Sequence, residues 1–150
     1  MNRPLFIDTN VPIYAAGTAH PLKEPCAEIL LLIAAQPSAF ITDAEVLQEL
    51  LHRYLALRRW SLGSQVLQHF STIMQGRIEP VQPMDVQRAA ALADWYPGLS
   101  ARDLLHAAVM ERTGARAIIT ADRNFDVLPQ LERLDPVDLS LWKGRVSAGG

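Results

Sequence analysis

Apolar residues in this chain fall into two patterns, short uninterrupted runs and longer segments with helical spacing. Runs such as LFI at 5–7 and AII at 117–119 are typical of strands that are buried on both faces of a sheet. We therefore expect strands at residues 4–8, 39–42, 78–81, 117–120 and 133–136. The alternation of such strands with helices predicts an α/β fold, in which helices cover both faces of a parallel sheet.

Between these strands the apolar positions recur at helical spacing. The pattern predicts helices at residues 22–35, 44–59, 61–75, 84–96, 100–113 and 137–146, with a short turn of helix at 123–128. Asn10 is a candidate N-cap for a further short helix after the first strand. Gly76 and Gly114 follow two of the predicted helices and are expected to end them. From about residue 143 the chain is expected to form a loose C-terminal tail.

Composition narrows the class of protein without identifying it. The chain has 150 residues, of which 49% are hydrophobic and 20% charged, as expected of one ordinary globular domain. A single cysteine excludes an internal disulfide and suits a reducing cytosol. The longest apolar run, 29–35, is too short to span a bilayer, and no signal-peptide pattern opens the chain. The net charge of −2 indicates no global attraction to nucleic acid.

Two carboxylates follow predicted strands. Asp8 ends the first strand segment, and Asp122 lies two residues beyond Thr120 at the end of another. Ligands bind outside the carboxyl ends of parallel strands, so both side chains are candidates for one cleft. The local alternative for each is an Asx turn or a helix cap. Asp126 has a stronger alternative, because it could lie on the solvent face of the short helix.

Two further carboxylates lie on predicted helices. Glu49 falls about 60° outside the apolar arc of helix 44–59, so it is a boundary residue that is able to reach the rim of a cleft. Its alternative is a helical ion pair with Arg53. Asp103 fits a capping box with Ser100, but its helix is apolar nearly all round and therefore largely buried.

Four carboxylates in one cleft would repel one another, and a bound cation would remove that repulsion. Hard oxygen ligands in this number suit Mg²⁺ or Mn²⁺ better than Zn²⁺. The histidines show neither HxH nor HExxH spacing. We expect His106, one turn after Asp103, to be an ordinary helix residue rather than a ligand.

Three segments together resemble the PIN domain family, and more narrowly the VapC-type ribonuclease toxins of bacterial toxin–antitoxin pairs. They are FIDTN at 6–10, VLQELLHR at 46–53 and ARDLLHAAVMERTGARAIITADRNFD at 101–126. The resemblance implies one domain over 1–150, folded as a three-layer α/β/α sandwich with a central parallel sheet. It implies an acidic metal site with catalytic and supporting positions: Asp8, Glu49 (rather than Glu45), Asp103 and Asp122, with Asp126 as a further acidic position and Asn10 and Thr120 as polar supports.

The resemblance also implies a mechanism and partners. Mg²⁺ or Mn²⁺ at the acidic site, with Glu49 a direct or water-mediated ligand, would activate water for in-line attack on an RNA phosphodiester. The products would carry 5′-phosphate and 3′-hydroxyl ends. Arg53, Arg58 and Arg59 are candidates for RNA phosphate contacts, or else form a solvated helix face. A homodimer is expected, as is a VapB-type antitoxin whose tail lies over a groove between helices 22–35 and 44–59.

Two other functions fit parts of the pattern. An aspartate-nucleophile phosphatase of the haloacid dehalogenase type also begins with an aspartate after a strand. Its chemistry needs a second aspartate where this chain has Asn10, and a lysine where the chain has none between Lys23 and Lys143. A non-catalytic interaction module with the same architecture is the other alternative, and the complete set of carboxylates argues against it.

Overall fold

The computed structural model describes residues 3–148, and these residues build one five-stranded parallel sheet. The strand order is β3–β2–β1–β4–β5, so β1 lies at the centre and the two edges are β3 and β5. The strands are β1 Leu5–Ile7, β2 Phe40–Asp43, β3 Ile78–Glu79, β4 Ala117–Ile119 and β5 Glu132–Leu134. The bounds of β1, β2 and β4 lie within one residue of those that the apolar runs predict, whereas β3 and β5 are shorter and end two residues earlier than expected.

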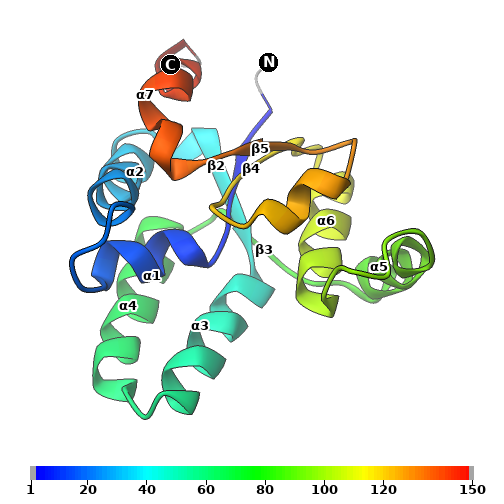
Figure 1. Cartoon of the computed structure of the whole chain (residues 1–150), viewed down its shortest axis with the longest axis horizontal. Helices are drawn as coiled ribbons and strands as arrows, with labels where there is room; N and C mark the ends of the chain where they lie inside the picture. Colours follow the sequence, from blue (N-terminus) through cyan, green and yellow to red (C-terminus); the bar gives the residue numbers. More distant parts are fainter. Residues whose placement is uncertain (1–2, 149–150) are drawn as a thin grey trace.

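Helices cover both faces of this sheet, which confirms the expected three-layer arrangement (Figure 1). In that view α1, α2 and α4 lie to the left of the sheet, and α5 and α6 lie to the right. The longer helices are α1 Asn10–Ala16, α2 Lys23–Ala35, α3 Ala44–Ala56, α4 Trp60–Ile73, α5 Pro83–Trp95 and α6 Ala101–Thr113. Short 3₁₀ turns complete the chain at η1 Pro37–Ala39, η2 Arg123–Val127 and η3 Pro136–Asp138.

The core forms because both faces of the central strands are apolar. Phe6, Ile7, Ile118 and Ile119 are fully buried between the helical layers. Pairing of β1 with β4 aligns Ile7 with Ile119, so the residues that follow each strand emerge side by side. This register positions the candidate site at the carboxyl edge of the sheet.

The helices that carry site residues have well-defined ends. Asp43 caps α3 by accepting a hydrogen bond from the Val46 backbone N–H, at 2.9 Å. Ser100 caps α6 in the same way, accepting from the Asp103 N–H at 3.2 Å, as predicted. Gly114 ends α6 in the left-handed region, at φ 81°, which is favourable only for glycine and a few polar residues. Asp103 is therefore fixed in the first turn of a buried helix.

Three local predictions were wrong. Asn10 does not cap α1, because its side chain is used in contacts across the sheet edge. The predicted helix 137–146 is broken into η3, α7 Leu139–Trp142 and α8 Gly144–Ala148. The expected loose tail is also corrected over 143–146, since Lys143 pairs with Glu28 and Val146 is buried. Residues 149 and 150 lie outside the described part of the chain.

The lone thiol is buried on α2, between the helical layer and the sheet. Cys26 has no solvent exposure, and burial raises the pKa of its thiol to about 12. Across residues 3–148, the helices are too short or too polar for any of them to cross a membrane.

Candidate functional site

Asp8 and Thr120 meet directly because their strands, β1 and β4, are paired in parallel. The Thr120 hydroxyl donates to Asp8 Oδ2 at 2.7 Å, and the Thr9 backbone N–H donates to Asp8 Oδ1, also at 2.7 Å. Both side chains are buried. The Thr120 hydroxyl also accepts from the Asp122 backbone N–H at 3.0 Å, so one hydroxyl links two of the predicted acidic positions.

Asn10 completes this network instead of capping its helix. Its amide Nδ2 donates to Thr120 Oγ1 at 2.7 Å and lies 3.4 Å from Asp8 Oδ2. Its carbonyl Oδ1 accepts from the Ala121 backbone N–H at 3.3 Å. The Asp8 carboxylate is thereby held in one orientation, and it keeps unused lone pairs for a further ligand.

One cavity of about 330 Å³ gathers the four candidate carboxylates. They come from four separate parts of the fold: the end of β1, the middle of α3, the first turn of α6 and the turn before η2. Glu49 lines this cavity and Glu45 does not, which agrees with the face chosen from the sequence. The lining residues are Asp8, Thr9, Asn10, Ile13, Glu49, Arg53, Gly98, Ser100, Arg102, Asp103, Asp122 and Asn124.

The electrostatic environment differs among these carboxylates. Burial is the largest influence on the pKa of Asp8 and raises it. Burial also raises the pKa of Asp103, and the negative charge of Asp122 adds to the increase. Burial acts to raise the pKa of Glu49 too, but His106, together with Thr9 and Arg102, outweighs it and the pKa is lowered. Ionising all four groups in this cavity is therefore costly without a compensating positive charge.

Two residues of the site were missed from the sequence, namely Asp43 and His106. Both side chains are completely buried, and His106 Nδ1 lies 2.8 Å from Asp43 Oδ2. The other ring nitrogen, His106 Nε2, lies 3.5 Å from Glu49 Oε1 and 3.8 Å from Asp8 Oδ1. Asp43 ends strand β2 just as Asp8 ends β1, so the rule that found Asp8 would have found it. His106, one turn after Asp103, was expected to be an ordinary helix residue, and it instead lies among three carboxylates.

The three carboxylates determine the charge of His106. Burial acts to lower the pKa of the imidazole, but the attraction of Asp43 and the two cavity carboxylates raises it well above its usual value. Nε2 has no hydrogen-bond partner within the described residues, and neither has the buried Thr9 hydroxyl. Thr9 lines the acidic cavity, and His106 Nε2 lies behind two of its carboxylates, those of Glu49 and Asp8.

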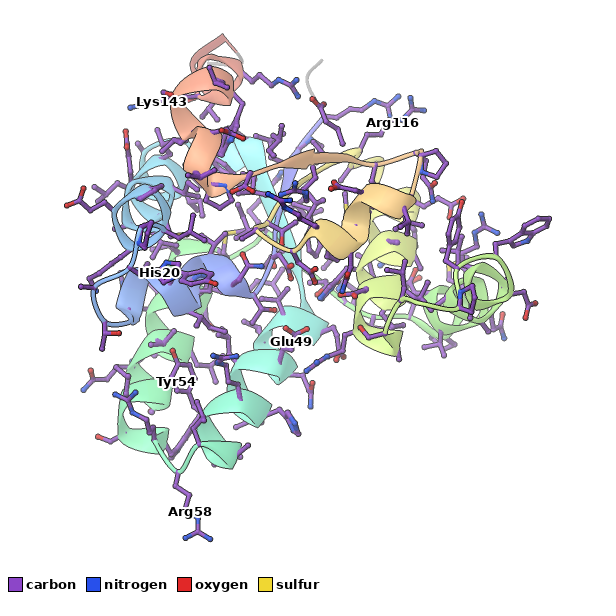
Figure 2. All side chains as sticks on the ribbon, viewed as in Figure 1. His20, Glu49, Tyr54, Arg58, Arg116 and Lys143 are labelled. Atoms are coloured by element: carbon purple, nitrogen blue, oxygen red, sulfur yellow. The ribbon has the colours of Figure 1, made fainter. Side chains whose placement is uncertain are left out.

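Three of the predicted residues lie away from the cavity. Asp126 is exposed, as expected if it lies on the solvent face of the short helix, and it forms an ion pair with Arg133 at 2.8 Å. Arg58 and Arg59 lie at the tip of the α3–α4 hairpin, where Arg58 extends into solvent (Figure 2). Arg53 does line the cavity, and so does Arg102, whose Nε lies 3.5 Å from Glu49 Oε1.

The donor set fits a hard divalent cation. All four carboxylates carry oxygen atoms of the kind such a cation prefers, and two of them have pKa values raised by burial, so a cation would offset the cost of ionising them. Within residues 3–148, no three acidic, histidine or cysteine side chains form a ready-made cage. Mg²⁺ does not need one, because it keeps several waters and binds through one or two carboxylates.

The fold and the site together define an α/β protein with an acidic cavity at the carboxyl edge of a parallel sheet. The PIN domain model matches residues 5–131, and the chain belongs to this family. It is 35% identical over 130 residues to ribonuclease VapC13 of Mycobacterium tuberculosis, covering 87% of this chain and 98% of that protein.

Solved structures show the same fold at lower identity. VapBC2 from Rickettsia felis, bound to a DNA fragment from its promoter, gives a TM-score of 0.68 at 17% identity, with 87% of this chain and 97% of the other covered. A toxin–antitoxin complex from Klebsiella pneumoniae gives a TM-score of 0.59 at 16% identity, covering 88% and 97%.

Proposed function

We propose that this protein is a Mg²⁺- or Mn²⁺-dependent endoribonuclease and the toxin of a toxin–antitoxin pair. The observation that carries the proposal is the single cavity lined by Asp8, Glu49, Asp103 and Asp122. Four elements far apart in the sequence converge there, and a positively charged ligand would offset the repulsion among their carboxylates. The relative named ribonuclease VapC13 supports RNA as the substrate.

Different residues of the site would bind the cation, orient its ligands and contact the substrate phosphate. Asp8, Asp103 and Asp122 would hold the cation, and Glu49 would hold it directly or through water. When bound, the cation would supply positive charge against the phosphate and lower the pKa of the attacking water. Thr120 and Asn10 keep Asp8 oriented, so the ligand oxygens need little rearrangement. Arg53 and Arg102, both on the cavity lining, are positioned to contact the substrate phosphate.

Water as the attacking group distinguishes this chemistry from that of many ribonucleases. The 2′-hydroxyl of RNA is not required, and the products should carry 5′-phosphate and 3′-hydroxyl ends. No side chain needs to act as a nucleophile, and Ser100 on the cavity lining is used as the cap of α6.

An antitoxin and a second copy of the chain are the proposed protein partners. The solved Klebsiella pneumoniae complex is described as a toxin–antitoxin complex, which supports an antitoxin here. Apolar side chains gather near the α3–α4 turn, where Leu55, Leu57 and Trp60 are at least one third exposed. In the structure α3 packs on α4 rather than on α2, so this α3–α4 end is a better docking surface than the groove expected between α2 and α3.

The decisive experiment is RNA cleavage by the purified protein with Mg²⁺ or Mn²⁺, compared with EDTA and with the Asp8→Asn variant. We expect cleavage that requires both the metal and Asp8 and leaves 5′-phosphate ends. Urea unfolding of the variant, which should show a folded protein, is the control. Metal-dependent cleavage by a folded Asp8→Asn variant would contradict the site. Absence of cleavage with every RNA tested, in metal-loaded and antitoxin-free protein, would favour a non-catalytic interaction module.

A further inference from the structure

A second concave surface runs along the α5–α6 layer, outside the acidic cavity. This α5–α6 groove has a volume of about 760 Å³. Its floor is formed by α5, α6 and the turn before β5, and it extends from the amino ends of β1 and β4 to the connection between α5 and α6. The residues of interest on its lining are Arg3, Arg88, Trp95, Tyr96, Glu111 and Arg116.

The groove is positively charged, although the whole chain has a net charge of −2. Arg88 is neutralised by Glu111, at 2.8 Å. Arg3 and Arg116 have no acidic partner within residues 3–148; Arg3 donates to the Gly114 carbonyl at 3.1 Å, which fixes its position. Two arginines without acidic partners are thus exposed on one surface, where they suit a polyanion.

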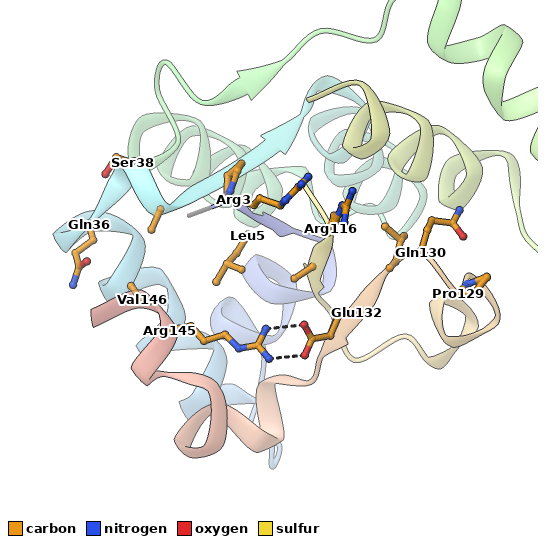
Figure 3. Close-up of a pocket in the computed structure, with 14 residues that line it drawn as sticks. Arg3, Leu5, Gln36, Ser38, Arg116, Pro129, Gln130, Glu132, Arg145 and Val146 are labelled. Atoms are coloured by element: carbon orange, nitrogen blue, oxygen red, sulfur yellow. Dashed lines mark hydrogen bonds and ion pairs between the residues drawn. The ribbon is translucent and has the colours of Figure 1, made fainter. Parts of the chain in front are cut away.

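A neighbouring cavity of about 910 Å³ at the amino ends of the strands shares the same two arginines (Figure 3). Its third arginine, Arg145, is paired with Glu132 through two contacts of 2.6 and 2.7 Å, drawn as dashed lines in the figure. Unpaired positive charge in this region therefore comes from Arg3 and Arg116. These two residues mark the end of the groove that lies farthest from the acidic cavity.

The other end of the groove presents aromatic side chains. Trp95 is 81% exposed, and Tyr96 beside it is half-buried. An indole with so much exposed surface contributes little to the core and offers a flat face to a ligand. Arginines on phosphates combined with an exposed aromatic ring on a base are the usual elements of single-stranded nucleic acid binding.

The groove leads to the acidic cavity. Trp95 and Tyr96 line the groove, and Gly98 and Ser100 of the same α5–α6 connection line the cavity. Helix α6 spans the distance from that connection to the arginine end, and its 13 residues correspond to about 20 Å. A single strand of a few nucleotides could therefore occupy both places at once.

We propose that the α5–α6 groove is a second RNA contact, which binds the single-stranded segment flanking the cleaved phosphodiester. Arg3 and Arg116 contact its phosphates, and Trp95 stacks on a base. The identity of the ligand as RNA rests on the proposed nuclease function, whereas the affinity of this basic, aromatic groove for a single strand does not.

The test is the affinity for fluorescently labelled, unstructured RNA, measured by anisotropy in EDTA so that metal-dependent cleavage does not interfere. The variants are Trp95→Ala and the double variant Arg3→Gln/Arg116→Gln. Leu141→Ala is the control for an exposed apolar side chain, at 82% exposure, and Lys143→Gln is the control for a lost surface charge. Each is compared on an RNA of about 12 nucleotides and on a trinucleotide, which is too short to reach both places.

We expect Trp95→Ala and the double variant each to weaken binding of the longer RNA at least about fivefold, since stacking and phosphate contacts are both lost. The double variant should also reduce the slope of log affinity against log salt by about 1.4. The controls should stay within about twofold of the parent affinity. The trinucleotide should bind more weakly than the longer RNA, and its binding should fall in the same two groove variants, because in EDTA the acidic cavity holds no cation for its phosphates.

Unchanged binding of the longer RNA in both groove variants would overturn the proposal. So would a change in oligomeric state in Trp95→Ala by size-exclusion chromatography, because the surface would then be an interface between copies of the chain. The nuclease proposal is tested separately. A wild-type protein that binds RNA through the groove but cleaves no RNA would contradict the nuclease proposal and would leave the groove proposal supported.

Discussion

At the scale of single residues, buried charged side chains in the site offset one another's free-energy cost of burial. His106 is completely buried, yet it lies between Asp43, Glu49 and Asp8. A buried charge is tolerated only when it is paired, and here the imidazole and the carboxylates provide that pairing for each other. Removing one member leaves the remaining charge buried without its partner.

The His106 pair predicts a pH-dependent stability. The folded pKa of His106 is raised well above its usual value of 6.5, so the folded state binds this proton more tightly than the unfolded chain. Its contribution to the free energy of unfolding is complete below about pH 6.5 and is lost as pH rises through the raised value. Urea unfolding in EDTA at pH 6 and pH 9 should show wild type losing more stability than His106→Gln. An identical loss in both proteins would contradict the assigned charge.

Replacing Thr120 should reduce the cleavage activity more strongly than its effect on stability alone would explain. Thr120→Val keeps the shape but removes the hydroxyl that links Asp8 to the Asp122 backbone N–H. We expect a loss of about 1–3 kcal/mol in the free energy of unfolding and at least a tenfold loss of cleavage. Thr113→Val is the matched control, because that hydroxyl bonds only to carbonyls of its own helix. Equal cleavage by the two variants would remove Thr120 from the site.

At the scale of secondary structure, local patterns predicted the strands well because each strand is a continuous apolar run. The rule on strand ends made Asp8 and Asp122 candidates, whereas Glu49 was assigned to the site through the family resemblance, with its angle on the helix favouring it over Glu45. The contacts that the sequence did not reveal join distant residues. Asp43 and His106 are 63 positions apart, and Asn10 and Thr120 are 110 apart. The strand order determines which strand ends meet, and the strand order cannot be predicted from local periodicity.

Because α3 packs closely on α4, we expect a substitution at Gly63 to destabilise the fold. A Cβ added at Gly63 would lie 2.3 Å from Tyr54 Cβ, so any larger residue forces the two helices apart. We expect Gly63→Ala to lower the free energy of unfolding by about 1–3 kcal/mol, measured by urea unfolding. Gly98→Ala is the control, because nothing lies within 4 Å of its added Cβ. Similar stability of the two variants would contradict this close helix packing.

At the scale of the whole molecule, charge is distributed unevenly over the surface. Carboxylates gather at the carboxyl edge of the sheet, and Arg3 and Arg116 lie toward the amino edge. Figure 2 shows Arg116 toward the top of the view and Glu49 well below it, near the middle. A net charge near zero therefore results from two opposite local charges, each suited to a different ligand.

Cation binding at the acidic edge should stabilise the entire fold. A ligand that binds only the folded state adds about 2.7 kcal/mol to the free energy of unfolding at a concentration 100 times its Kd. We expect Mg²⁺ to raise the Tm of wild type and to have a much smaller effect on Asp8→Asn. Ca²⁺-free buffers of constant ionic strength are needed, so that screening is the same in every sample. An equal shift in both proteins would place the cation elsewhere.

The reactivity of the buried Cys26 thiol on α2 can be used to measure local opening of the fold. Cys26 can react with a disulfide reagent only when α2 separates from the layer beneath it, because its sulfur is fully covered and its pKa is about 12. Helix α2 packs on α1, whose first residue, Asn10, holds Asp8. The rate of thiol labelling should therefore fall when the acidic cavity is filled by its cation, and it can be followed without any RNA or any change to the sequence.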